Sequence, residues 1–75
     1  MEIFPRITVE ADKCGGKPCI RGHRLIVEHL LSLLAEGSTP EELLAEWDFL
    51  EAQDISAVFR FASHLAGERS AAIAS

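Results

Sequence analysis

Residues 15–27 read Gly-Gly-Lys-Pro-Cys-Ile-Arg-Gly-His-Arg-Leu-Ile-Val, and this stretch decides the fold expected of the N-terminal third of the chain. Gly15 and Gly16 can take the positive φ angles that a tight turn needs. Pro18 fixes its own φ and lacks an N–H, which suits a turn exit or the start of an edge strand. Gly22 indicates a second bend. The stretch therefore predicts a compact, cation-bearing hairpin rather than a helix or a flexible linker.

The segment before the two glycines supplies the other strand of that hairpin. Residues 7–9 are β-branched, so the chain from residue 3 to residue 9 is expected to be extended. Pro5 forces an edge position or a break in this segment. Residues 19–21 return as a second short strand. A two-stranded hairpin is barely stable alone in water, so it must pack on helices or pair with a second copy.

Two helices are expected next, over residues 26–36 and 40–48. The first has apolar residues at i, i+3, i+4 and i+7 and is followed by Gly37, in the usual position for a helix end. The second has a clear start signal, with Thr39 as N-cap and Glu42 completing a capping box.

A third helix is expected over residues 51–66 and is predicted to end at Gly67. One side of it is apolar and is predicted to be buried: Ile55, Val58, Phe59, Ala62 and Leu65 or Ala66. Residues 68–75 are predicted to form a flexible tail. The expected architecture is mainly α, in one domain: residues 1–24 form a β-hairpin arm, and residues 25–67 form a three-helix bundle with helix-turn-helix geometry.

Length and composition bound the class of protein. A chain of 75 residues allows one domain with a marginal core, and 48% of the residues are hydrophobic, so we expect a homodimer. No apolar run approaches the roughly 18 residues that span a bilayer, which predicts no membrane partner. The N-terminus lacks the features of a signal peptide. A cytoplasmic protein with reduced thiols at Cys14 and Cys19 is therefore expected.

Charge is divided unevenly along the chain. Residues 1–24 carry five cations and three anions, whereas residues 25–75 carry two cations and nine anions. The basic end is the expected nucleic-acid contact, through Lys17, Arg21 and Arg24, although arginines in loops also often bridge to carboxylates. The acidic helical half disfavours contact with a phosphate backbone, and we discount base reading by the third helix.

Cys14, Cys19 and His23 are residue types that bind zinc. They provide three ligands without an obvious fourth, so we predict no metal and no cofactor. Cys14 with His23 is also the one candidate catalytic pair, but nothing nearby in the sequence orients the imidazole. We therefore predict that the protein is not an enzyme and has no catalytic residue.

Four residues are candidates for a partner or dimer interface. Phe61 falls off the predicted apolar stripe of the third helix, next to Arg60, which is typical of a docking residue. A second core layer or a dimer contact is the alternative for Phe61. Ile7 and Val9 are included because the N-terminal strands could pair between protomers.

Three stretches resemble the domain-of-unknown-function family 433: GGKPCIRGHRLIV, LLSLLAEGSTPEELLAEW and EAQDISAVFRFA. The resemblance runs from about Ile7 to Ala66 and implies a homeodomain-like fold, with three helices behind a short β segment. The chain departs from the family pattern at His23, where threonine is usual, at Ile26, where proline is common, and at Glu51, where Thr or Ser would cap the third helix.

Members of that family resemble the antitoxin half of VapBC-type pairs and are often paired with a PIN-like nuclease. The resemblance implies a type II antitoxin that neutralises such a nuclease and binds its operator DNA. An arginine could block the acidic metal site of the nuclease: Arg60, Arg69 or one of the hairpin arginines. Two alternatives stay open, a DNA-binding transcriptional regulator without a toxin partner and a homo-oligomeric scaffold domain.

Overall fold

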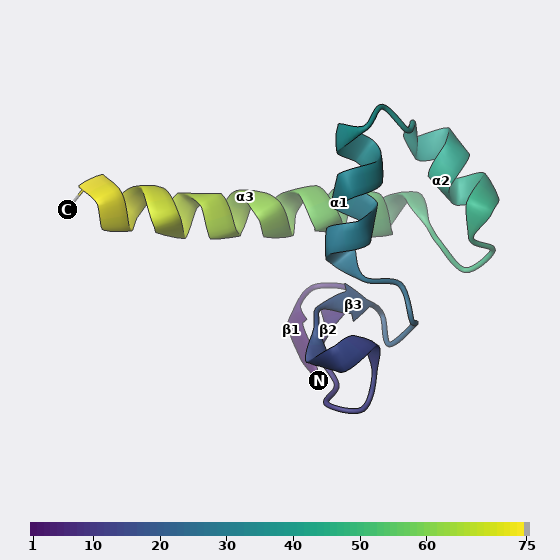
Figure 1. Cartoon of the computed structure of the whole chain (residues 1–75), viewed down its shortest axis with the longest axis horizontal. Coiled ribbons are helices and arrows are strands. Elements are labelled where there is room, and N and C mark those ends of the chain that lie inside the picture. The colour runs from purple at the N-terminus through teal and green to yellow at the C-terminus, as the bar shows by residue number, and fades with distance from the viewer. Residues whose placement is uncertain (75) are drawn as a thin grey trace.

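The computed structural model describes residues 1–74, with side chains described as far as Glu68. Three strands form an antiparallel sheet in the order β1-β2-β3: β1 (Glu2–Phe4), β2 (Ile7–Thr8) and β3 (Cys19–Ile20). A 3-10 turn, Cys14–Gly16, precedes β3, and three helices follow it: α1 (Val27–Ala35), α2 (Pro40–Glu46) and α3 (Ala52–Ala74). Figure 1 shows α3 running along the long axis of the molecule and projecting away from the sheet and the other helices. The predicted mainly α fold, with a short β segment before three helices, is confirmed.

The N-terminal segment forms two strands, so of the two outcomes expected for Pro5, an edge position or a break, the structure shows the break. Pro5 and Arg6 make a two-residue turn between β1 and β2, and Arg6 has a φ of 70°. This is the φ of the second central residue of a type II turn, a position that usually carries glycine. β2 then pairs with β3, with Ile7 opposite Ile20, and both side chains are fully buried.

A second tight turn follows β3, at the bend indicated by Gly22. Arg21 and Gly22 have φ values of 40° and 76°, and positive φ at both central residues is typical of a type I′ hairpin turn. The His23 N–H donates to the Ile20 carbonyl at 2.7 Å, and the Ile20 N–H donates to the Leu25 carbonyl at 3.0 Å. The chain therefore folds back along β3 before it enters α1.

The capping box predicted for α2 is present. The Thr39 hydroxyl accepts from the Glu42 N–H at 3.2 Å, and the Glu42 carboxylate accepts from the Thr39 N–H at 2.8 Å. Gly37 ends α1 with a φ of 107°, as expected of a glycine just after a helix. Gly37 thus ends α1 and the capping box begins α2, so that only a short connection separates the two helices.

The core joins the sheet to all three helices: Ile7, Ile20, Leu25, Val27, Leu30, Leu43, Leu50, Ile55, Val58 and Phe61. Phe61, expected at an interface, packs against Phe4 with ring centroids 5.4 Å apart, whereas Phe59, expected in the core, is 50% exposed. Phe61 thus follows the alternative of a second core layer, and the expected burial of Phe59 was wrong, because the buried stripe of α3 begins with the polar Asp54 and continues through residues 57, 58 and 61. Because the first buried position of this stripe carries a charged residue, the apolar pattern of the sequence does not show which face of α3 is buried.

Helix α3 continues through Gly67 to Ala74, so the prediction that it ends at Gly67 was wrong. Gly67 lacks the positive φ that Gly37 adopts at the end of α1. The side chains of residues 69–75 lie outside the described residues, so the predicted flexibility of residues 68–75 stays a prediction. Over residues 1–74, no helix combines the length and the apolar character needed to cross a membrane.

Gly67→Ala is expected to strengthen the C-terminal half of α3. A Cβ at this position meets no atom within 4 Å, and alanine favours a helix over glycine by about 1 kcal/mol. Helical content measured by far-UV circular dichroism should therefore rise. Gly37→Ala is the matched control, and its φ of 107° should make the same change destabilising. A gain in helicity for both variants, or for neither, would contradict this account of the two glycines.

Candidate functional site

Among the described residues, Asp54 is the one charged side chain that is fully buried. Its Oδ1 accepts from Arg6 Nη1 and from Arg21 Nε, each at 2.9 Å. Its Oδ2 accepts from Arg21 Nη2 at 2.8 Å and from the Glu51 N–H at 2.9 Å. A buried carboxylate requires such partners, because an unpaired charge in the interior is very costly.

The same contacts set the protonation state of the group. Burial by itself raises the pKa of Asp54, but hydrogen bonds from Arg21, from Arg6 and from the Glu51 N–H outweigh it. The pKa of Asp54 consequently lies below its ordinary value of 3.8. The hydrogen bond to Asp54 raises the pKa of Arg21, and hydrogen bonds to Glu51 and then Asp54 raise that of Arg6. The cluster is a fully ionised network at neutral pH.

Arg21 therefore has a structural partner, the alternative that the sequence left open for the hairpin cations. Its guanidinium makes a two-pronged contact with Asp54 and donates to the Phe49 carbonyl at 2.6 Å. Lys17 pairs with Glu28 at 3.2 Å, and since both side chains are exposed this pair contributes little stability. Arg24 is exposed, and no ion pair within the described residues involves it. The three predicted nucleic-acid contacts thus differ in their surroundings.

The three potential zinc ligands are not gathered into a site. Burial, followed by the neighbouring Cys14, raises the pKa of the Cys19 thiol to about 11, so this thiol stays protonated. The His23 ring stacks on Phe49 with centroids 3.8 Å apart. Over the part of the chain that the structure describes, no three His, Cys, Asp or Glu side chains lie where they could hold a metal ion.

Three of the four interface candidates are held within the chain itself. Ile7 is fully buried and Phe61 is 8% exposed, so neither can present its side chain to a partner. Val9 exchanges two hydrogen bonds of 2.9 Å with Met1, which occupy its backbone N–H and carbonyl. The Val9 backbone is therefore paired within the chain, whereas β1 is an edge strand with no strand on its outer side among the described residues. Arg60 is exposed.

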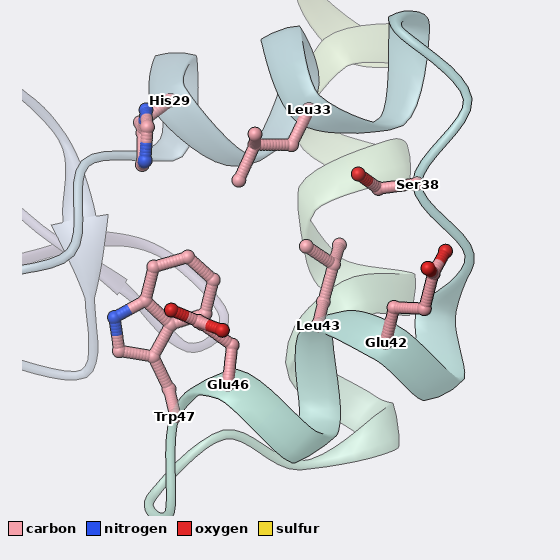
Figure 2. Close-up of a pocket in the computed structure, with 7 residues that line it drawn as sticks. All are labelled: His29, Leu33, Ser38, Glu42, Leu43, Glu46 and Trp47. Carbon is pink, nitrogen blue, oxygen red and sulfur yellow. The ribbon is translucent and has the colours of Figure 1, made fainter.

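A groove lies between α1 and α2 (Figure 2). Its volume is about 390 Å³, and it is lined by His29, Leu33, Ser38, Glu42, Leu43, Glu46 and Trp47. Figure 2 shows Leu33 and Leu43 pointing into the space between the two helices, with the Trp47 indole facing α1. The Trp47 ring meets His29 edge-on with centroids 6.0 Å apart. The groove combines an apolar floor with acidic side chains from α2.

Sequence reasoning did not single out this groove as a site. Trp47 and Glu46 were not among the predicted site residues, and Glu42 was predicted only as part of the capping box. His29 and Leu33 are spaced i, i+4 on α1, which places them on one face. Whether His29 and Leu33 lie near Trp47 depends on the angle between α1 and α2, and the periodicity of the sequence does not predict that angle.

Comparison with known proteins gives two matches. The profile of a family described as "Protein of unknown function (DUF433)" matches residues 7–62. A crystal structure at 2.00 Å resolution of a DUF433 member protein from Anabaena variabilis ATCC 29413 is similar to this chain, with 30% sequence identity and a TM-score of 0.77. The alignment covers 93% of this chain and 69% of that chain. No curated protein matches.

Asp54→Asn is expected to lower the free energy of unfolding by roughly 3 kcal/mol, because it leaves two guanidinium groups without their buried counter-charge. Urea unfolding followed by Trp47 fluorescence measures the change. Asp48→Asn is the control, since Asp48 is exposed, and should cost less than about 0.5 kcal/mol. Similar losses for the two variants would show that the Asp54 network does not hold the fold together.

The same carboxylate should limit stability in acid. Because the folded pKa of Asp54 lies below the ordinary 3.8, its contribution is fully present above about pH 4. It is lost as the pH falls through the lowered folded value, since the folded state must then take up a proton. The melting temperature should fall over this range, and less steeply in Asp54→Asn. Equal acid sensitivity in both proteins would assign the effect to other carboxylates.

Proposed function

Since this chain belongs to the DUF433 family of proteins of unknown function, we propose that it is an antitoxin-like, non-enzymatic binding protein that neutralises a PIN-like nuclease. The observation that carries the proposal is the groove between α1 and α2, with its apolar floor and acidic side chains. The nuclease and the type II toxin–antitoxin pairing enter from the resemblance of this family to VapBC-type antitoxins.

The floor of the groove suits a protein partner. Leu33 and Trp47 are half-buried and offer apolar surface that a partner side chain can desolvate, above the buried Leu43. Tryptophan is over-represented among the residues that dominate binding energy, because it combines a large apolar area with little conformational entropy to lose. A single anchoring side chain of the partner would fit a volume of about 390 Å³.

The polar residues of the groove favour binding over catalysis. His29, Ser38 and Glu46 are the residue types of a hydrolase, but no hydrogen bond joins them in the described part of the chain. The His29 ring packs edge-on against Trp47, and the carboxylate of Glu42 is bound to the Thr39 N–H. A nucleophile activated by a neighbouring base, which such catalysis requires, is therefore not assembled.

Charge indicates the chemistry of the partner. Residues 25–68 carry nine acids and one cation, Arg60, and two of the acids, Glu42 and Glu46, line the groove. Complementary potentials speed association and exclude wrong partners. The surface that docks here should thus present Lys or Arg side chains around a large apolar residue. Arg60 is retained as the cation that enters the acidic site of the nuclease, whereas the side chain of Arg69 lies outside the described residues.

Glu46→Lys is expected to weaken the complex with a PIN-like nuclease partner by about tenfold, because it reverses a charge that attracts the partner. Lysine is favourable near the C-terminal end of a helix, so the fold should be retained. Co-purification from cells that express both proteins, followed by calorimetric titration, measures the effect. Relief of nuclease toxicity in growing cells is the functional readout.

Glu36→Lys is the matched control, since it makes the same charge change at the exposed end of α1, outside the groove. It should leave affinity within about twofold of the unaltered protein. Failure of the unaltered chain to bind the nuclease or to relieve its toxicity would overturn the antitoxin proposal. Equal losses of affinity in both variants would show that the net charge of the protein affects binding and that the partner does not bind specifically at the groove.

Operator binding, or regulation of DNA without a toxin, is the second candidate, and the exposure of Arg24 favours it. If DNA is bound, Arg24→Ala should weaken binding across all sequences and flatten the salt dependence by about one unit, with an unchanged melting temperature. Arg21→Ala should lower the melting temperature through loss of its contact with Asp54. Binding titrations at several salt concentrations test this. An unchanged slope in Arg24→Ala would contradict a phosphate contact there.

A further inference from the structure

The C-terminal half of α3 projects from the body of the molecule, which it contacts through the His64 ring, with ring centroids of His64 and Phe4 5.7 Å apart. The helix has 23 residues and therefore a length of about 34 Å, against a longest molecular axis of 43 Å. Figure 1 shows it leaving the body beyond the point where α1 crosses it. Phe61 is the last buried residue on it, and residues 63–68 are all exposed. A solitary helical segment of about a dozen residues is marginal in water, so this segment needs a partner.

The projecting segment is amphipathic. Phe59 and Leu65 are 50% and 44% exposed, two of the four large hydrophobic side chains recorded as exposed. Ala62 and Ala66 share their face, since the spacing of three and four residues aligns side chains along a helix. The opposite face is polar: Arg60, His64 and Glu68, with His64 Nε2 and Glu68 Oε1 3.2 Å apart. The apolar face is thus left open to solvent by the chain's own fold.

Charge identifies a second copy as an occupant that this face accepts. Residues 25–55 carry eight acids and no cation, so two copies repel each other wherever these surfaces meet. Residues 56–68 carry one cation, Arg60, and one acid, Glu68, both on the polar side. The apolar face of α3 is therefore the part of the helical half where two copies can approach without a like-charge penalty.

Side-chain size determines the direction of pairing. Phe59 lies at one end of the apolar face and Ala66 at the other. An antiparallel second helix places each Phe59 against the Ala66 of the other copy, so that a large side chain fills the space over a small one. A parallel helix would place Phe59 against Phe59 and leave a gap at Ala66. A two-fold axis near Ala62 makes the two antiparallel contacts identical, as an isologous interface requires.

We propose that two copies of this chain form a homodimer by antiparallel pairing of the projecting halves of α3, through the face of Phe59, Ala62, Leu65 and Ala66. The dimer interface lies on α3, separate from the groove between α1 and α2. The proposal therefore does not depend on the antitoxin function.

Light scattering coupled to size-exclusion chromatography tests the proposal on the full chain at micromolar concentrations. The unaltered protein should elute at twice the chain mass. Leu65→Glu should raise the dissociation constant at least tenfold and yield monomer, with an unchanged melting temperature of the monomer core, because the side chain is half exposed. Gln53→Glu is the matched control on the same helix, with the same charge change at an exposed position two turns before Arg60 on the polar side, and should remain dimeric.

A size swap tests the antiparallel register. Ala66→Phe should dissociate the dimer by setting two large side chains against each other, and the double variant Phe59→Ala with Ala66→Phe should restore it. A monomeric unaltered protein up to about 100 µM would overturn the proposal, as would dissociation of Gln53→Glu to the same extent as Leu65→Glu. Failure of the double variant to restore the dimer would overturn the antiparallel arrangement.

Discussion

The buried carboxylate of Asp54 is the contact on which the rest of the structure depends. It binds Arg6 from the first sheet turn, Arg21 from the second, and the N-terminal backbone of α3. Both arginines sit at positive φ, where most residues other than glycine are strained, and the ion pairs offset that strain. Only a long side chain with a planar, multi-donor head can reach from each turn to the same carboxylate. The three-stranded sheet is too small to be stable alone, so this network and the apolar contacts of Ile7 and Ile20 fix it to the helices.

The same network explains how charge is distributed over the surface. Two of the five cations of residues 1–24 are used to neutralise Asp54, and Lys17 is paired with Glu28. Most of the cations in the N-terminal third are therefore already paired with acids of the same chain. The acids of α2 make no ion pair within the described residues, and Glu42 and Glu46 make the groove acidic. A surface that the sequence suggests for nucleic acid is thus better suited, in the folded chain, to holding the fold together.

Local signals in the sequence predicted the helices and their ends where a single residue decides the geometry. The capping box of Thr39 and Glu42 and the glycine after α1 are examples, and family 433 was recognised from the same stretches.

The errors arose where tertiary contacts override local rules. Arg6 occupies a turn position that usually carries glycine, so the sequence allowed a break at Pro5 without predicting a tight turn between two paired strands. Asp54 heads a buried stripe because distant arginines neutralise it, and without them the stripe was set at Phe59 instead of Phe61. The groove was missed because it depends on the angle between two helices.

The two proposed surfaces lie on different elements, and this has a physical consequence for binding. The groove is formed by α1 and α2, whereas the projecting half of α3 extends away from both (Figure 1). Two-fold pairing through α3 would leave both grooves open and hold them at a fixed separation. A partner that is itself two-fold symmetric could then occupy both grooves at once, and the second contact would form at high effective concentration. Each groove could be shallow and each contact weak, since the joint affinity would come from the rigid helix pair that spaces them. In this arrangement the apolar face of α3 would form the dimer, and the dimer would position the two acidic grooves for the same partner.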